Sequence, residues 1–107
     1  MLHYFPPPVD TRIRQAIAGK NLVEIHYKHQ SRIVEPHDYG VQRGVARLLV
    51  YQLRTTGTTA GKDAFGWRLF DVPKIESLVV LETTFKGSRR ESGQDHHAWD
   101  VLYARVE

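Results

Sequence analysis

Arginines inside strand-like segments are the side chains best placed to do chemistry in this sequence of 107 residues. Arg32 alternates with Val34, and Arg68 alternates with Phe70 and Val72. Residues two apart on a strand share one face of a sheet. If the apolar residues face the core, each guanidinium points toward the core near its open end, where an unpaired charge is costly.

Each of these guanidinium groups therefore requires a partner, and two alternatives stay open. One partner is a carboxylate of the same chain, supplied by Glu24, Glu35 or Asp71. The other is the phosphate of a ligand, which the planar guanidinium binds through paired hydrogen bonds. The aromatic rings that could stack on the bases of such a ligand are Tyr27, Tyr39 and Trp67.

A glycine-rich stretch at residues 57–63 (GTTAGKD) has a superficial likeness to a phosphate-binding loop. One residue too few separates its glycines, and Asp63 stands where a Ser or Thr would hold magnesium. The flanking segments are strand-like, so no helix N-terminus would face a phosphate. We interpret this stretch as a hairpin loop.

The six histidines do not have the spacing of a metal site. His26 and His29 would lie on opposite faces of one strand. His96 and His97 are adjacent, which makes it difficult for both to bind one ion from regular structure, although Asp95 and Asp100 are near in sequence. We interpret these side chains as surface histidines and predict no metal ion and no cofactor.

Motifs for catalysis are missing as well. No Gly-x-Ser-x-Gly sequence is present to place a nucleophilic serine. The glutamates of the strand-like segments stand singly rather than in pairs, at Glu24, Glu35, Glu76 and Glu82. We therefore predict that the protein is not an enzyme and has no catalytic residue. A deep pocket that joins His37, Asp38 and another titratable group would revive an enzymatic interpretation.

The overall composition excludes several classes of protein. The formal net charge is +3 and the isoelectric point is near 9.4, a mild excess that permits a polyanionic partner without requiring one. The absence of cysteine excludes disulfides, a thiol nucleophile and metal sites with sulfur ligands. No apolar run reaches the roughly 20 residues of a membrane helix, and no signal-peptide layout is present, so we expect a cytoplasmic protein without a membrane partner.

Hydrophobic spacing predicts one short helix near the start of the chain. The apolar residues with helical spacing are Ile13, Ala16 and Ile17. Asp10 or Thr11 is expected to cap the start of this helix, and Gly19 to end it. A helix of this length is marginal alone, so it must dock on the rest of the domain.

Alternating apolar and polar residues predict five strands after the helix, at residues 22–28, 32–35, 45–53, 65–72 and 75–81, where the fourth begins at either Phe65 or Trp67. Residues 29–31 are expected to connect the first two strands, and Pro36 to stop the second. Glycines at Tyr39-Gly40 and Arg43-Gly44 indicate a turn region before the third strand. Near the C-terminus the apolar residues fit both a helix and a strand, and this alternative stays open.

This order of elements favours a mainly β fold, a small barrel or sandwich, with one short N-terminal helix. Residues 1–10 would form an extended lead-in, residues 11–85 the five-stranded domain, and residues 86–107 a C-terminal extension that packs on it.

Several of these segments together resemble the WYL domain family. The two more specific stretches are R-x-V-E-P at residues 32–36 and R-x-F-x-V-x-x-I at residues 68–75. Weaker likeness at residues 13–17, 23–27 and 44–51 extends the resemblance over most of residues 11–85. The resemblance implies a small barrel of the SH3 or Sm type that senses nucleic acid or nucleotide-like ligands through a basic groove.

The resemblance also carries ligand binding over to particular residues of this chain. Arg32, Arg68 and Tyr27 match the family pattern, and Lys74 follows in the second stretch. The tripeptide that names the family corresponds to Ala46-Arg47-Leu48, which keeps only the leucine, and Arg47 adds a positive charge there.

Together the residues and the resemblance predict a stand-alone, regulatory binding module for single-stranded nucleic acid or a nucleotide-like anionic ligand. In the family this domain usually follows a helix-turn-helix, but only one short helix fits before residue 22, so we expect no DNA-reading domain here. The alternative is a protein-interaction or assembly module, a homo-oligomer included, that uses exposed strand edges.

Overall fold

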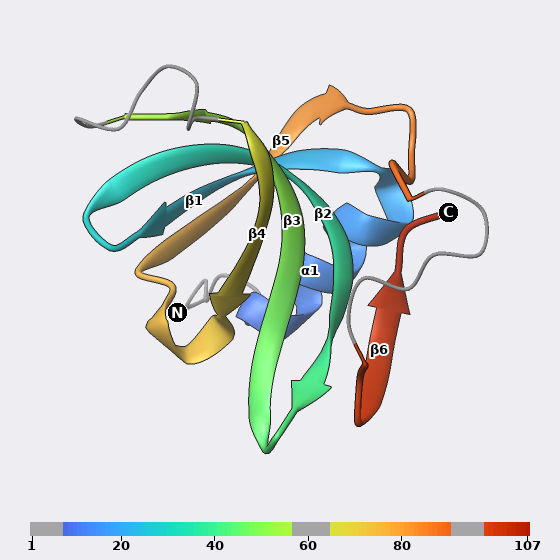
Figure 1. Ribbon diagram of the computed structural model, residues 1–107. Coiled ribbons are helices and arrows are strands. Elements are labelled where there is room, and N and C mark those ends of the chain that lie inside the picture. The colour runs from blue at the N-terminus through green and yellow to red at the C-terminus, as the bar shows by residue number, and fades with distance from the viewer. Residues whose placement is uncertain (1–7, 57–64, 91–97) are drawn as a thin grey trace, which may run out of the picture.

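The computed structural model describes residues 8–56, 65–90 and 98–107, which form a mainly β fold with one α-helix (Figure 1). This confirms the prediction of a mainly β fold with one short N-terminal helix. The elements are α1 (Val9–Gly19), β1 (Asn21–Tyr27), β2 (Gln30–Gln42), β3 (Val45–Thr55), β4 (Gly66–Asp71), the short 3-10 helix η1 (Val72–Lys74), β5 (Ser77–Thr84) and β6 (Val101–Arg105). No helix in these ranges is long and apolar enough to cross a membrane.

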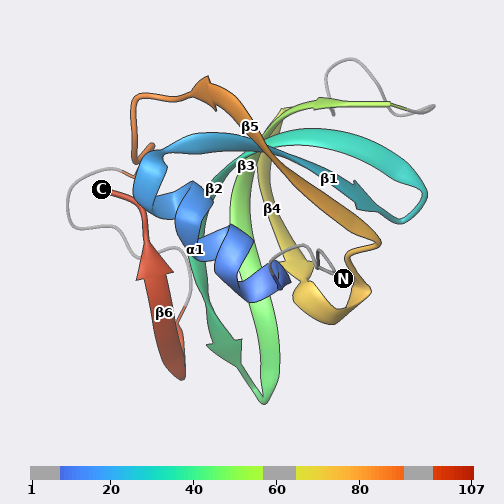
Figure 2. The same cartoon turned by 180° about the vertical axis from the view of Figure 1, so that it is seen from behind.

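The strands form one antiparallel sheet with the order β4-β3-β2-β1-β5. β3 pairs with one edge of β2 over nearly its whole length, from Arg32 to Gln42. The other edge of β2 has two neighbours: β1 pairs with its first half, up to Val34, and β6 pairs with its second half, from Asp38 to Val41. The sheet therefore branches at residues 35–37 of β2, and Figures 1 and 2 show β1 and β6 diverging from it.

The predicted five-stranded closed barrel is not confirmed. The sheet has six strands in the described residues, and no ladder there joins its end strands, β4 and β5. Side chains instead join β4 to β1, the strand next to β5. The Tyr27 hydroxyl at the end of β1 accepts a hydrogen bond from the Asp71 amide of β4 (3.2 Å), and its ring packs 4.5 Å from that of Phe70. We call this junction of Tyr27, Phe70 and Asp71 the seam.

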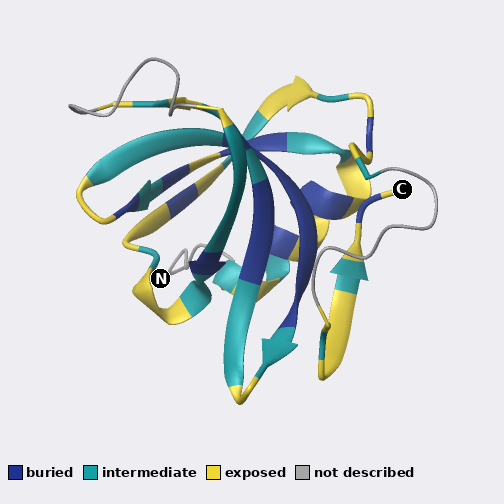
Figure 3. Ribbon diagram, viewed as in Figure 1, coloured by how far each residue is buried: buried dark blue, intermediate teal, exposed yellow. Residues whose placement is uncertain are grey.

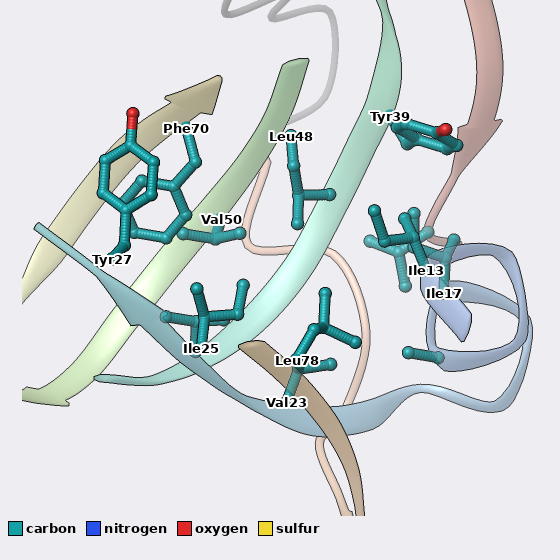
Figure 4. Packing of buried hydrophobic residues seen from close by; sticks show 13 residues of the cluster. Ile13, Ile17, Val23, Ile25, Tyr27, Tyr39, Leu48, Val50, Phe70 and Leu78 are labelled. Atoms are coloured by element: carbon teal, nitrogen blue, oxygen red, sulfur yellow. The ribbon is translucent and has the colours of Figure 1, made fainter. Parts of the chain in front are cut away.

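The hydrophobic core lies between α1 and the inward face of the curved sheet (Figure 4). Ile13, Ala16 and Ile17 are buried on α1, as their spacing predicted. The sheet supplies Val23, Ile25, Val34, Leu48, Val50, Phe70 and Leu78. Burial is continuous along the middle of β2 and β3 (Figure 3). Two-residue alternation in β1 is also confirmed, because Val23, Ile25 and Tyr27 are buried while Glu24 and Lys28 are exposed.

Both ends of α1 differ from the prediction. The helix begins at Val9, after Pro8, so Asp10 and Thr11 lie inside its first turn and neither caps it. Lys20, not Gly19, takes the left-handed conformation that closes the helix (φ 54°), and its amide donates to the carbonyl of Ile17 (3.3 Å). Gly19 is the last helical residue. A Cβ there would lie 2.3 Å from Asn21 Oδ1, so glycine leaves room for the side chain of Asn21, whose amide bonds the Leu81 carbonyl of β5.

The predicted end of the second strand at Pro36 is wrong, and so is the turn at Tyr39-Gly40. β2 continues through both to Gln42, and the chain reverses at Arg43-Gly44, where both residues have positive φ. The register shifts between Pro36 and Asp38, so His37 is an extra residue opposite β3. Pro36 is tolerated because it lies at this bulge, on the stretch of β2 that pairs with neither β1 nor β6.

The first hairpin turn also starts one residue earlier than expected, because Lys28 and His29 have positive φ and Gln30 already belongs to β2. The C-terminal segment, for which helix and strand were both open, forms strand β6. Its close approach to β2 depends on Gly40, where a Cβ would lie 2.1 Å from the Val101 carbonyl oxygen.

Candidate functional site

Arg32 lies on the core-facing side of β2, at the seam. Its guanidinium carbon is 5.8 Å from the ring centroid of Tyr27 and 5.3 Å from that of Phe70. Figure 4 shows these two rings side by side at one end of the core. The position follows from the alternation that places Arg32 on the same face as the buried Val34.

The hydrogen-bond partners of Arg32 are all uncharged. Its Nε donates to the Tyr27 carbonyl (3.4 Å), Nη1 to Gln52 Oε1 (3.1 Å) and Nη2 to Gln30 Oε1 (3.0 Å). Among the described residues no carboxylate forms an ion pair with Arg32. The internal ion pair that the sequence left open is therefore not made within these ranges. The two glutamine partners were not foreseen, because Gln52 lies 20 residues away on another strand.

Arg68 brings a second positive charge to the same place. It stands on β4 in the register position opposite Val50, and its Nη1 donates to the Trp67 carbonyl (2.9 Å). Burial lowers the pKa of Arg32, and the nearby charge of Arg68 lowers it further. The structure therefore brings together the two arginines that the strand pattern singled out, one from each side of the seam.

Arg47 and Lys74 both lie at the carboxylate of Asp71. Arg47 Nε is 3.1 Å from Asp71 Oδ1, and Lys74 Nζ is 3.5 Å from Asp71 Oδ2. Arg47 also donates to Gln42 Oε1 (3.3 Å). These two predicted binding residues are thus paired with Asp71, on the outer side of the seam, and do not share the partners of Arg32.

The aromatic residues expected to stack on a ligand are mostly enclosed. Tyr27 is 6% exposed and Tyr39 4%, and the Tyr39 hydroxyl donates to Asp10 Oδ1 (2.7 Å). Trp67 packs edge-on against the rings of His37 and Tyr51, with centroids 4.7 and 5.4 Å away. The structure therefore does not group these three rings around Arg32.

A second polar assembly fills the branch of the sheet, and the sequence reading missed it. We call it the branch cluster; its members are Glu35, His37, Asp38, Arg89, Arg90 and Arg105. Arg89 holds Glu35 through both carboxylate oxygens (2.6 and 3.1 Å) and lies 4.1 Å from the ring centroid of Tyr51. Residues 35–37 lack a strand neighbour on this edge, and the charged side chains of Arg89, Arg90 and Arg105 pack there instead.

Asp38 is completely buried in this cluster and binds two guanidinium groups. Arg90 Nη2 is 2.7 Å from Oδ1, and Arg105 Nε and Nη2 donate to Oδ1 and Oδ2 at 3.1 and 3.2 Å. The Trp99 indole donates to Oδ2 as well (3.3 Å). A buried carboxylate with this many charge-assisted bonds ties β6 and residue 90 to β2.

His37 is also fully buried, between Trp67 and Phe85. Its Nε2 accepts the Arg89 amide hydrogen (3.1 Å), so Nδ1 carries the ring proton and donates to the Glu35 carbonyl (2.9 Å). Burial is the largest cause that lowers the pKa of His37, and the charge of Arg90 acts in the same direction. Neither His37 nor Asp38 has exposed surface for a substrate to reach.

No protein-family model, curated protein or solved structure matches this chain. The site must therefore be judged on its own geometry. In the described part of the chain, no group of three or more His, Asp or Glu side chains is arranged to hold a metal ion. The stretch at residues 57–63 and the histidines His96 and His97 lie outside the described residues.

Chemically, the seam and the branch cluster differ in how their charges are balanced. In the branch cluster each buried carboxylate meets arginine, so the charges compensate one another. At the seam the partly buried Arg32 contacts only uncharged groups and faces a second cation. A site of that kind gains most from the arrival of an anion, because burial strengthens the attraction. The seam is therefore the candidate functional site.

Proposed function

We propose that this chain is a binding module for phosphate-bearing anions, single-stranded nucleic acid or a nucleotide-like ligand, which it binds at the seam through Arg32 and Arg68. We also propose that the module has a regulatory role in the cytoplasm. Its fold would be the WYL-like barrel of the SH3 or Sm type that the sequence resemblance implies. One observation carries the proposed binding: the Arg32 guanidinium is partly buried beside Arg68 and has no ion pair with a carboxylate in the described residues.

Charge balance explains why this observation supports a ligand. A guanidinium removed from water loses hydration, and hydrogen bonds to neutral oxygens replace only part of that loss. A second positive charge nearby raises the cost. A phosphate between the two groups would offset both effects and form charge-assisted bonds with each.

Titration of a short fluorescent oligothymidylate at several salt concentrations tests the proposal. If about three phosphates are neutralised, the affinity should fall with salt with a log–log slope near −2 on single strands. The double variant Arg32→Ala/Arg68→Ala should bind at least tenfold more weakly at low salt and lose about 1.4 of that slope, because two of the phosphate contacts are gone.

The matched control is Arg43→Ala/Arg54→Ala, which removes the same charge from two exposed positions; Arg43 lies in the turn after β2, and Arg54 pairs with Ile33 and so faces the side of the sheet opposite to Arg32. It should bind within about threefold of the wild type. Arg32→Lys keeps the charge and reports on binding if Arg32→Ala fails to fold. Absence of binding at low salt, or equal loss in both double variants, would refute the proposal.

A second candidate function, assembly with another protein chain, is favoured by the surface of β6. Val101, Leu102 and Tyr103 are 49, 41 and 40% exposed, and β6 pairs only with β2 in the described residues (Figure 3). Such apolar edge strands can pair with a partner strand. Light scattering across a hundredfold concentration range decides whether the chain pairs with itself, and a constant monomer mass counts against that form of assembly.

A further inference from the structure

We infer that the seam recognises the phosphate of its ligand and not the base, so that a sugar-phosphate chain without bases binds there as well as an oligonucleotide does. This inference rests on the proposed function and names the chemical group that is read. Binding sites for single strands commonly combine basic side chains with aromatic rings on which bases stack. At the seam the aromatic rings are buried.

The two rings beside Arg32 are buried and pack against neighbouring side chains. Tyr27 is 6% and Phe70 2% exposed, and they pack against each other with centroids 4.5 Å apart. The Arg32 guanidinium lies over both, and Lys28 Nζ lies 5.9 Å from the Tyr27 centroid. A base could reach the face of Tyr27 or Phe70 only by displacing the arginine that is to bind its phosphate.

Other aromatic rings near β4 are covered by neighbouring side chains. The Tyr51 ring is covered by Arg89 and packs against Trp67, on the side of the sheet that faces the branch cluster. Phe65 is the exception, because it is 60% exposed and immediately precedes Gly66, which pairs with Gln52. Phe65 is therefore the residue that could provide a stacking surface and overturn the inference.

Arg32 itself is suited to a phosphate. Its three bonds to Tyr27, Gln30 and Gln52 fix the plane of the guanidinium and leave further N–H donors of the group for a ligand. A planar group held in one orientation next to a second cation matches two oxygens of a phosphate, whose negative charge compensates both cations, whereas the neutral edge of a base compensates neither.

The experiment compares two fluorescent ten-residue probes, oligothymidylate and an abasic deoxyribose-phosphate chain of equal length, with the intact protein. We expect dissociation constants within about threefold of each other. We also expect both to rise at least tenfold in Arg32→Ala/Arg68→Ala and to stay within about threefold in Arg43→Ala/Arg54→Ala. Inorganic phosphate and a 5′-phosphorylated abasic chain, used as competitors, distinguish a terminal phosphate from internal phosphodiesters.

The outcomes separate this inference from the proposed function. If oligothymidylate binds and the abasic chain binds more weakly by about fivefold or more, as loss of stacking predicts, the inference is overturned while the proposed function stands. Phe65→Ala then shows whether that ring is responsible, since it should weaken only the thymidylate complex. If neither probe binds, both proposals are overturned. Equal binding that depends on Arg32 and Arg68 supports both.

Discussion

At the scale of single residues, His37 shows how burial fixes the protonation of a side chain. Its ring donates through Nδ1 to the Glu35 carbonyl and accepts through Nε2 from the Arg89 amide. Protonation would place a hydrogen on Nε2 opposite the Arg89 N–H and add a positive charge near Arg90. The carboxylates of Glu35 and Asp38 act in the other direction, but desolvation outweighs them.

The stability of the protein should therefore fall in mild acid. The pKa of His37 is lowered in the folded state, whereas in the unfolded chain it has its ordinary value near 6.5. Below that value the unfolded state binds more protons, so the free energy of unfolding decreases as the pH drops from about 6.5 toward the folded pKa, by at most about 1.4 kcal/mol per pH unit. Urea denaturation at pH 7.5 and 5.5 measures this change.

His37→Gln is the comparison for this experiment. It is less stable at both pH values, because Gln does not reproduce both ring hydrogen bonds, but its difference between pH 7.5 and 5.5 should be smaller than that of the wild type. An equal difference in both proteins would contradict the assignment. The Asp10 carboxyl, whose pKa is lowered chiefly by the Tyr39 hydroxyl, affects stability only below about pH 4 and does not interfere.

For a single residue, the sequence predicts which face of a strand the side chain lies on, but not which residues it contacts. The alternation of Arg32 with Val34 predicted that this arginine faces the core, and it does. Its neighbours could not be predicted, because Gln52 reaches it only through the pairing of β2 with β3. The branch cluster could not be predicted for the same reason, because Asp38 and Arg105 are 67 residues apart in the sequence.

At the scale of elements, β2 shows why strand ends are hard to read from residue types. Pro36 and Gly40 both suggest breaks, yet each occupies a place that the neighbouring strands make acceptable. Pro36 lies where no strand pairs on the branch side, and Gly40 lies where β6 comes too close for a side chain. Such places are properties of the pairing, which local sequence does not contain.

Gly40→Ala should detach β6 from β2. A Cβ at this position would lie 2.1 Å from the Val101 carbonyl oxygen and 2.9 Å from Trp99 Cε3, so the strands must separate. We expect a loss of about 3 kcal/mol in the free energy of unfolding, at the upper end for overpacking, and a red shift of tryptophan emission as Trp99 gains water.

Gly44→Ala is the matched control for this substitution. It introduces the same methyl group, but nothing lies within 4 Å of it, and only its positive φ of 79° costs stability. The expected loss is about 1 kcal/mol with unchanged emission. Similar losses in both variants would contradict the close packing of β6 on β2.

At the scale of the whole molecule, the seam joins β4, one end strand of the sheet, to β1, with which β4 has no described ladder. Residue patterns predicted where most strands lie, but not the full length of β2, the strand β6 or the open edge between β4 and β5. Tyr27→Phe tests this junction, because it keeps the ring against Phe70 and removes only the acceptor of the Asp71 amide hydrogen.

We expect this variant to lose about 1 kcal/mol, and the Asp71 amide to exchange its hydrogen about fivefold faster or more. Hydrogen exchange followed by NMR gives both the rate at Asp71 and those of the core strands, which should change less. Tyr103→Phe, at a position 40% exposed, is the control and should stay within about 0.5 kcal/mol of the wild type. Unchanged exchange at Asp71 would show that the hydroxyl does not hold the seam.

The pairing of β6 with β2 also has a consequence for biosynthesis. Asp38 leaves the ribosome 67 residues before its partner Arg105, an interval of about 3 to 13 s at ordinary rates of translation. During that time the second half of β2 has its neighbour β3 but not β6, and the carboxylate of Asp38 has no guanidinium from β6 to meet. The nascent chain therefore keeps this edge of β2 unpaired until residues 101–105 have been synthesised.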